Sequence, residues 1–82
     1  MTMHRYLVVY EKAKGGYSAY APDLPGCVAA GKSRIECERL MAEAIDMHLA
    51  GMAEDGIRPP PPSSFAEVMV VPSPQHRTSG TR

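Results

Sequence analysis

The chain has 82 residues, 44% of them hydrophobic and 22% charged, and its nine basic and nine acidic residues give zero net charge. A chain this short forms one domain near the lower size limit for a self-sufficient core, and such domains often oligomerise. The neutral balance lacks the electrostatic signature of a general nucleic-acid binder. We see neither a long apolar run nor a signal-peptide pattern, so a cytoplasmic protein is the default expectation.

The first part of the chain has the pattern of three short antiparallel strands. Residues 4–11 carry apolar side chains on both faces, which predicts a central strand that is covered on both sides. A turn containing Gly15 and Gly16, with positive φ values at both, leads into a second strand over residues 16–21. A third strand is expected over residues 27–31.

The corner between the second and third strands has the sequence Pro-Asp-Leu-Pro-Gly. Pro22 and Pro25 each hold their own φ near −65° and push the preceding residue toward extended geometry. Gly26 can take a positive φ at little cost. We therefore expect a rigid corner, in which Asp23 either accepts hydrogen bonds from nearby backbone N–H groups or serves a partner.

Ser33 opens a predicted helix of about 22 residues, or about 33 Å at 1.5 Å per residue. Ser33 and Glu36 have the spacing of a capping box, and Gly56 supplies the stop. Apolar side chains recur at steps of three and four residues, which predicts a stripe facing the core. The stripe consists of Ile35, Leu40, Met41, Ala44, Ile45, His48, Leu49 and Met52.

Four consecutive prolines, residues 59–62, predict a stiff polyproline spacer that runs back along the sheet. A last strand is expected over residues 65–71. The order is then β-β-β-α-β, an α+β two-layer sandwich over residues 1–72. Residues 73–82 form a polar tail with too little apolar material to pack, so we expect disorder there.

Candidate chemical groups are few. Cys27 and Cys37 lack zinc-ligand spacing and are interpreted as small apolar fillers. His48 falls on the apolar stripe, and the other two histidines lie far from it in sequence. We predict no metal site, no cofactor and no enzymatic activity, because a two-metal nuclease needs several convergent carboxylates. The non-helical acids are Glu11, Asp23 and Glu67.

The helical segment is acidic, with six carboxylates against two arginines, a net charge of −4. Such a run is most simply a solvated face, but it also suits docking to a basic partner. The basic residues Arg5, Lys12, Lys14 and Lys32 are expected on the sheet side or at its turns.

Three motifs together resemble the HicB-like antitoxins: Tyr-Ser-Ala-Tyr-Ala-Pro-Asp-Leu-Pro-Gly-Cys at 17–27, Gly-Lys-Ser at 31–33, and Gly-Ile-Arg-Pro-Pro-Pro at 56–61. The resemblance spans residues 4–71. It implies a partial RNase H-like fold and a partner of the HicA type, a small basic toxin that cleaves RNA. The antitoxin would bind this toxin and cover its active site.

Two features depart from that family's pattern. Many members carry a C-terminal helix-turn-helix or ribbon-helix-helix, whereas the polar residues after Val71 are too few for either. The resemblance therefore does not carry DNA binding over to this chain. Lys32 also stands where an acid often precedes the capping residue.

The main hypothesis is a non-enzymatic antitoxin that contacts its toxin through Asp23, Glu36, Glu43 and Asp46. Pro22, Pro25, Gly26 and Ser33 would hold the surrounding structure. A homodimer is expected, because an exposed sheet edge invites pairing. The alternatives are a vestigial metal-dependent nuclease that uses Asp23 with Glu11 or Glu67, and an orphan structural domain without a toxin.

Overall fold

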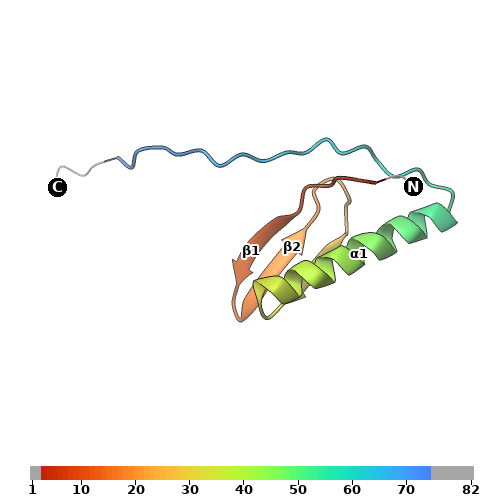
Figure 1. The fold of residues 1–82 in the computed structure, drawn as a ribbon, viewed down its shortest axis with the longest axis horizontal. Helices are drawn as coiled ribbons and strands as arrows, with labels where there is room; N and C mark the ends of the chain where they lie inside the picture. Colours follow the sequence, from red (N-terminus) through yellow and green to blue (C-terminus); the bar gives the residue numbers. More distant parts are fainter. Residues whose placement is uncertain (1–2, 75–82) are drawn as a thin grey trace.

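The computed structural model describes residues 3–74 and shows an α+β fold, as the sequence predicts. Three antiparallel strands, β1 (Val9–Ala13), β2 (Gly16–Tyr20) and β3 (Val28–Gly31), form a sheet in the order β1-β2-β3. The helix α1 (Arg34–Glu54) packs along the sheet (Figure 1).

The β1–β2 hairpin is tight, with Val9 opposite Tyr20 and Ala13 opposite Gly16. Of the two glycines expected to adopt positive φ, only Gly15 does so, at +83°. Gly16 already belongs to β2, where a Cβ atom would collide with the carbonyl oxygen of Gly31. The second glycine of the turn is therefore required by close backbone packing.

Both helix ends are capped by local sequence. The hydroxyl of Ser33 accepts the Glu36 N–H at 3.1 Å, and the Glu36 carboxylate accepts the Lys32 N–H at 2.6 Å. The carboxylate thus binds one residue before the cap, and the predicted capping box is reciprocal only in this shifted form. At the other end Gly56 has φ +70°, and the Ile57 N–H donates to the Met52 carbonyl at 2.8 Å.

No helix within residues 3–74 is long and apolar enough to cross a membrane.

The core lies between α1 and the sheet and is built from small and medium side chains. Its buried members are Ala19, Ala21, Leu24, Cys27, Cys37 and Met41. Both cysteines are free and buried, which confirms their interpretation as fillers, and burial raises the pKa of the Cys27 thiol. Leu24 and Cys27 bring the corner itself into the core.

One member of the predicted helical stripe is wrong. Ile35 is 79% exposed, whereas Cys37, which the stripe omitted, is fully buried. At 100° per residue the buried positions Cys37 and Met41 face the sheet, and Ile35 lies more than a right angle away from them. The small cysteine at position 37 lets the helix approach the Ala29 carbonyl of β3, at 4.0 Å from its Sγ.

The predicted last strand is also wrong. Residues 65–71 form an extended segment without strand pairing, and Phe65 and Val70 are 88% and 95% exposed. The first strand likewise begins at Val9 and not at residue 4, and it lies at the edge of the sheet and not at its centre. A strand needs a hydrogen-bonding neighbour, and within residues 3–74 neither segment has one. The predicted tail lies almost wholly outside the described residues.

Candidate partner-binding surfaces

The corner between β2 and β3 has a defined shape, which is consistent with the rigidity predicted from its sequence. Backbone hydrogen bonds close it: the Leu24 N–H donates to Ala21 and the Cys27 N–H donates to Leu24, both at 3.0 Å. Gly26 has φ +83°, a conformation that disfavours other residue types. The buried Leu24 side chain anchors this loop from inside, so Asp23 is held in a defined place on its outer surface.

Asp23 joins the corner to the segment that follows the helix. Its Oδ2 accepts the backbone N–H groups of Ser63 and Ser64 at 2.9 and 3.0 Å. Its Oδ1 accepts their two hydroxyls at 3.0 and 2.8 Å. We call Asp23, Ser63 and Ser64 the Asp23 clamp. Nearby, the Tyr6 hydroxyl donates to the Pro60 carbonyl at 2.6 Å and fixes the polyproline spacer as well.

The clamp shifts the acidity of Asp23. The backbone hydrogen bond from Ser64, then that from Ser63, and then the serine hydroxyls lower the pKa of the carboxyl from 3.8 to about 2. Each bond favours the charged form and lowers the pKa, whereas partial desolvation disfavours the charged form and raises it. Asp23 is therefore an ionised structural acceptor, consistent with the turn-chemistry alternative, although its bonds reach 40 residues along the chain.

The outer face of α1 is acidic. Glu43 and Asp46 are both exposed and lie one turn apart, so they share one side of the helix. Arg39 contacts Glu43 at 3.0 Å, and Arg34 lies 4.0 Å from Glu38. Both arginines of the helix are thus paired with acids, and within residues 3–74 Asp46 has no ion-pair partner. Asp46 therefore adds an uncompensated negative charge to this face.

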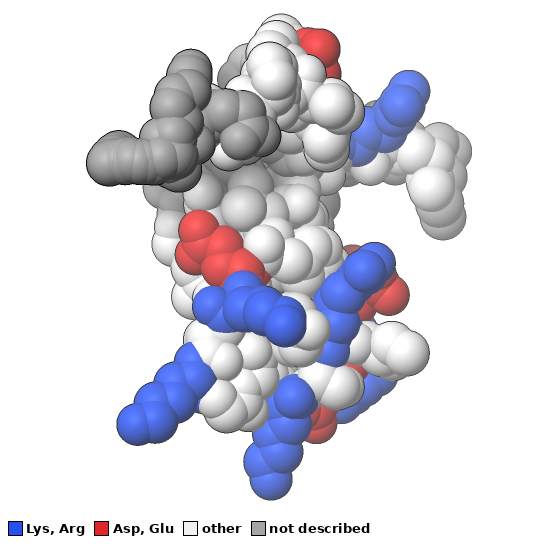
Figure 2. Space-filling model, turned by 90° about the vertical axis from the view of Figure 1, so that its left-hand side faces the viewer, with Lys and Arg blue, Asp and Glu red and all other residues white. Residues whose placement is uncertain are grey.

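Basic side chains gather at the end of the molecule opposite the corner between β2 and β3. Figure 2 shows Lys and Arg side chains projecting around the lower end, where the β1–β2 turn and the start of α1 lie. The exposed residues there include Lys14, Lys32 and Arg34. This distribution modifies the expected division into an acidic helix and a basic sheet, because the first turn of the helix lies among the lysines.

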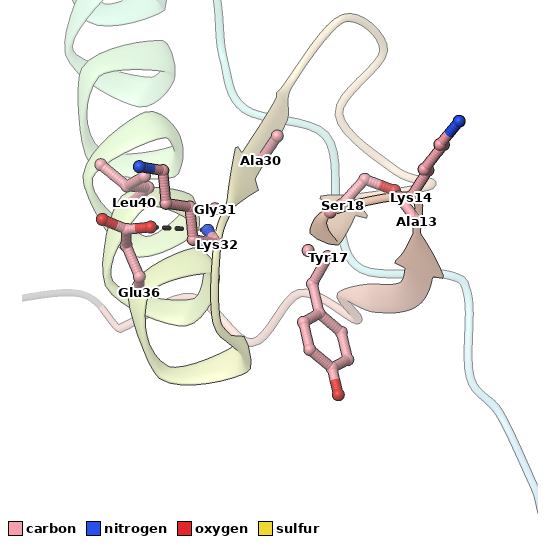
Figure 3. Close-up of a pocket in the computed structure, with 11 residues that line it drawn as sticks. Ala13, Lys14, Tyr17, Ser18, Ala30, Gly31, Lys32, Glu36 and Leu40 are labelled. Carbon is pink, nitrogen blue, oxygen red and sulfur yellow. Dashed lines mark hydrogen bonds between the residues drawn. The ribbon is translucent and has the colours of Figure 1, made fainter.

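A shallow hollow of about 470 Å³ lies at this basic end. Gly15, Tyr17 and Lys32 line it together with Glu36, whose carboxylate accepts the Lys32 N–H (Figure 3). Sequence patterns did not indicate this hollow, because its walls come from the hairpin and the helix start.

The four predicted contact residues do not form one surface. β2 leads up to the corner and β3 returns to the helix start, so Asp23 and Glu36 lie at opposite ends of these strands. That separation is roughly 15 Å at about 3.3 Å per residue. Asp23 and Glu36 accept backbone N–H groups of the chain, whereas Glu43 and Asp46 are exposed on one side of α1, with Glu43 paired to Arg39.

The residues of the nuclease alternative are also separated. Glu11 lies in β1 opposite Ser18, Asp23 is in the clamp, and Glu67 is on the exposed C-terminal segment. Within residues 3–74 no three His, Cys, Asp or Glu side chains lie close enough to hold a metal ion. Ser63 and Ser64 are the site residues that sequence reasoning missed, although a serine pair directly after a stiff spacer was a usable signal.

Comparison with known proteins gives a consistent result. The family model described as a HicB-like antitoxin of bacterial toxin–antitoxin systems matches residues 6–79. An uncharacterized 14.9 kDa protein of the rep-hol intergenic region of Haemophilus phage HP1 is 42% identical over 50 residues. A UPF0150 protein of Helicobacter pylori is 45% identical over 47 residues. These matches cover 61% and 57% of this chain, and 38% and 65% of the two relatives.

Proposed function

This chain belongs to the HicB-like antitoxin family, and we propose that it binds and neutralises a small basic toxin of the HicA type by covering its RNA-cleaving site. In this role the chain supplies a binding surface and performs no catalysis. We also propose that the chain descends from an RNase H-like fold and that its element order β1-β2-β3-α1 is the part of that fold that remains. The observation that carries it is the family match over most of the chain.

The charge distribution supports a basic partner. Asp46 is exposed and makes no ion pair within residues 3–74, and Glu43 shares its carboxylate with Arg39 on the same side of α1. A Lys or Arg of the toxin can take the place of Arg39 or bind Asp46 directly. Complementary potentials of this kind raise the association rate and select among partners.

The described contacts also rank the predicted contact residues. Glu43 and Asp46 are proposed as the direct contacts, because their carboxylates face solvent. Asp23 and Glu36 are proposed to act indirectly, by fixing the corner and the helix start, because each accepts backbone N–H groups of this chain. The bond of Glu43 to Arg39, by contrast, joins two exposed side chains and can be exchanged for one to a partner.

The first experiment is co-purification of the tagged full chain from its native host, followed by mass spectrometry. We expect a small basic protein at near-equal amounts that cleaves RNA when alone and stops when the chain is added. Recovery of no partner, or of a partner whose RNA cleavage the chain leaves unchanged, would contradict the proposal.

The second experiment locates the contact. Glu43→Lys/Asp46→Lys should weaken toxin binding at least tenfold and reduce its dependence on salt, measured by calorimetry at two ionic strengths. Glu11→Lys/Glu38→Lys makes the same charge change at exposed acids away from this pair and should bind as the unmodified chain does. Equal weakening in both variants would assign the effect to net charge and refute docking at Glu43 and Asp46.

A further inference from the structure

Residues 65–71, which we call the arm, expose five large apolar side chains. Phe65, Val68, Met69, Val70 and Val71 are each between 70% and 95% exposed. Figure 1 shows the arm running extended past the sheet and away from it. The Cα radius of gyration is 18.1 Å, whereas a compact chain of this size has about 11 to 12 Å.

The arm has the sequence of a strand. Phe65, Met69 and Val71 alternate with Val68 and Val70, so both faces of an extended segment would be apolar. Its backbone N–H and C=O groups have no partner strand within residues 3–74. An exposed apolar strand of this kind is a site of aggregation unless another chain covers it.

A complementary edge is open on the sheet. β1 is an outer strand of the order β1-β2-β3, so its far side carries free hydrogen-bonding groups. Residues 4–8, which continue β1 toward the N-terminus, are extended and have no strand partner either. The edge formed by residues 4–13 is long enough to pair with a seven-residue arm. Both the arm and this edge have backbone groups that no strand pairs with in the described residues.

The segment that precedes the arm, residues 59–64, directs the arm away from the sheet of its own chain. The polyproline spacer is stiff, and its carbonyl at Pro60 is held by Tyr6. The Asp23 clamp then fixes Ser63 and Ser64, immediately before the arm begins. The direction in which the chain leaves Ser64 is therefore set by five hydrogen bonds, and Figure 1 shows that it carries the arm beyond β1 instead of alongside it.

We propose that the arm of each chain adds as a fourth strand to the β1 edge of a second copy, giving a reciprocal strand-exchanged dimer. When two copies exchange the same segment, they form a closed dimer with two-fold symmetry, in which both arms are paired with a strand. The occupant is a second copy because the arm is apolar with a single acid, Glu67, and so offers a basic toxin little charge complementarity. Apolar surface of this kind is typical of permanent interfaces.

Light scattering coupled to size exclusion tests the proposal on the full chain. The unmodified chain should have twice the 8.9 kDa mass of one copy. Val68→Lys/Val70→Lys should halve that mass, and it should keep the helical circular dichroism because both side chains lie outside the monomer core. Ser73→Lys places one charge on the same exposed segment beyond the strand and should remain dimeric.

A second measurement identifies the exchanged segment. In a dimer reassembled from isotope-labelled and unlabelled chains, filtered nuclear Overhauser spectra should join arm protons of one chain to β1 protons of the other. A monomeric unmodified chain, a dimer that survives Val68→Lys/Val70→Lys, or arm-to-β1 contacts confined to one chain would each overturn the proposal. A monomer whose arm becomes protected only on addition of purified toxin would overturn it too, and would assign the arm to the toxin.

Discussion

Asp23 and Ser64 are joined by two hydrogen bonds across 41 positions of the chain, at 3.0 Å from the Ser64 N–H to Oδ2 and 2.8 Å from its hydroxyl to Oδ1. With the matching pair from Ser63, this contact fastens the segment after the helix to the corner between β2 and β3. The most distinctive turn of the sequence therefore serves as the anchor of the C-terminal part.

Removing the clamp carboxylate should free that segment. We expect Asp23→Ala to lower the melting temperature and to speed hydrogen exchange at the Ser63 and Ser64 amides, because four hydrogen bonds lose their acceptor. Asp46→Ala removes an exposed carboxylate without such bonds and should change neither quantity. Protection of the two serine amides that persists in Asp23→Ala would show that the spacer alone holds the segment.

The clamp should also open in acid. The folded pKa of Asp23, about 2, lies below its ordinary value of 3.8, so the stabilisation is complete above pH 4 and is lost as the pH falls toward 2. A carbon-detected titration of the Asp23 carboxyl should give a midpoint near 2, with exchange at Ser63 and Ser64 rising over the same range. A midpoint near 4 would mean that the clamp does not form in solution.

Two glycines should respond in opposite directions to alanine. A Cβ at Gly31 would lie 2.7 Å from the Cys37 N–H nitrogen, and such overpacking against backbone costs about 1–3 kcal/mol of unfolding free energy. A Cβ at Gly51, inside α1, meets nothing within 4 Å, so Gly51→Ala should stabilise the chain by up to about 1 kcal/mol. Urea denaturation of both variants measures the difference, and a neutral Gly31→Ala would disprove this tight contact between β3 and α1.

The buried leucine of the corner should contribute strongly to the stability of the core. Leu24 is 1% exposed, and truncation of a buried leucine costs about 2–5 kcal/mol, which is a large share of the stability of a small domain. Leu24→Ala should therefore unfold at much lower urea concentration. Ile35→Ala, at a 79% exposed position, should stay within about 0.5 kcal/mol of the unmodified chain. A larger loss of unfolding free energy in Ile35→Ala than in Leu24→Ala would contradict this prediction and would mean that Ile35 belongs to the core.

Local features were predictable because each depends on neighbouring residues. The Ser33 cap, the Gly56 stop and the rigid corner follow from hydrogen bonds and φ preferences that act within six positions. The apolar stripe was mostly recovered by its period, but Ile35 was misplaced because a run of eight positions covers too wide an arc of the helix. Cys37 was overlooked because a small side chain contributes little to a hydrophobic pattern, although it is the most buried residue of α1.

The limits of the sequence are clearest at the C-terminal segment. Its amino acids alone determine that residues 65–71 prefer an extended, strand-like backbone, and four prolines alone determine that the preceding spacer is stiff. Only the tertiary structure decided where that segment goes, because its direction depends on the Asp23 clamp and the Tyr6–Pro60 bond, which join positions 40 or more apart. Propensity specifies the conformation of a segment, whereas pairing requires a neighbour in space, and within residues 3–74 residues 65–71 have no such neighbour.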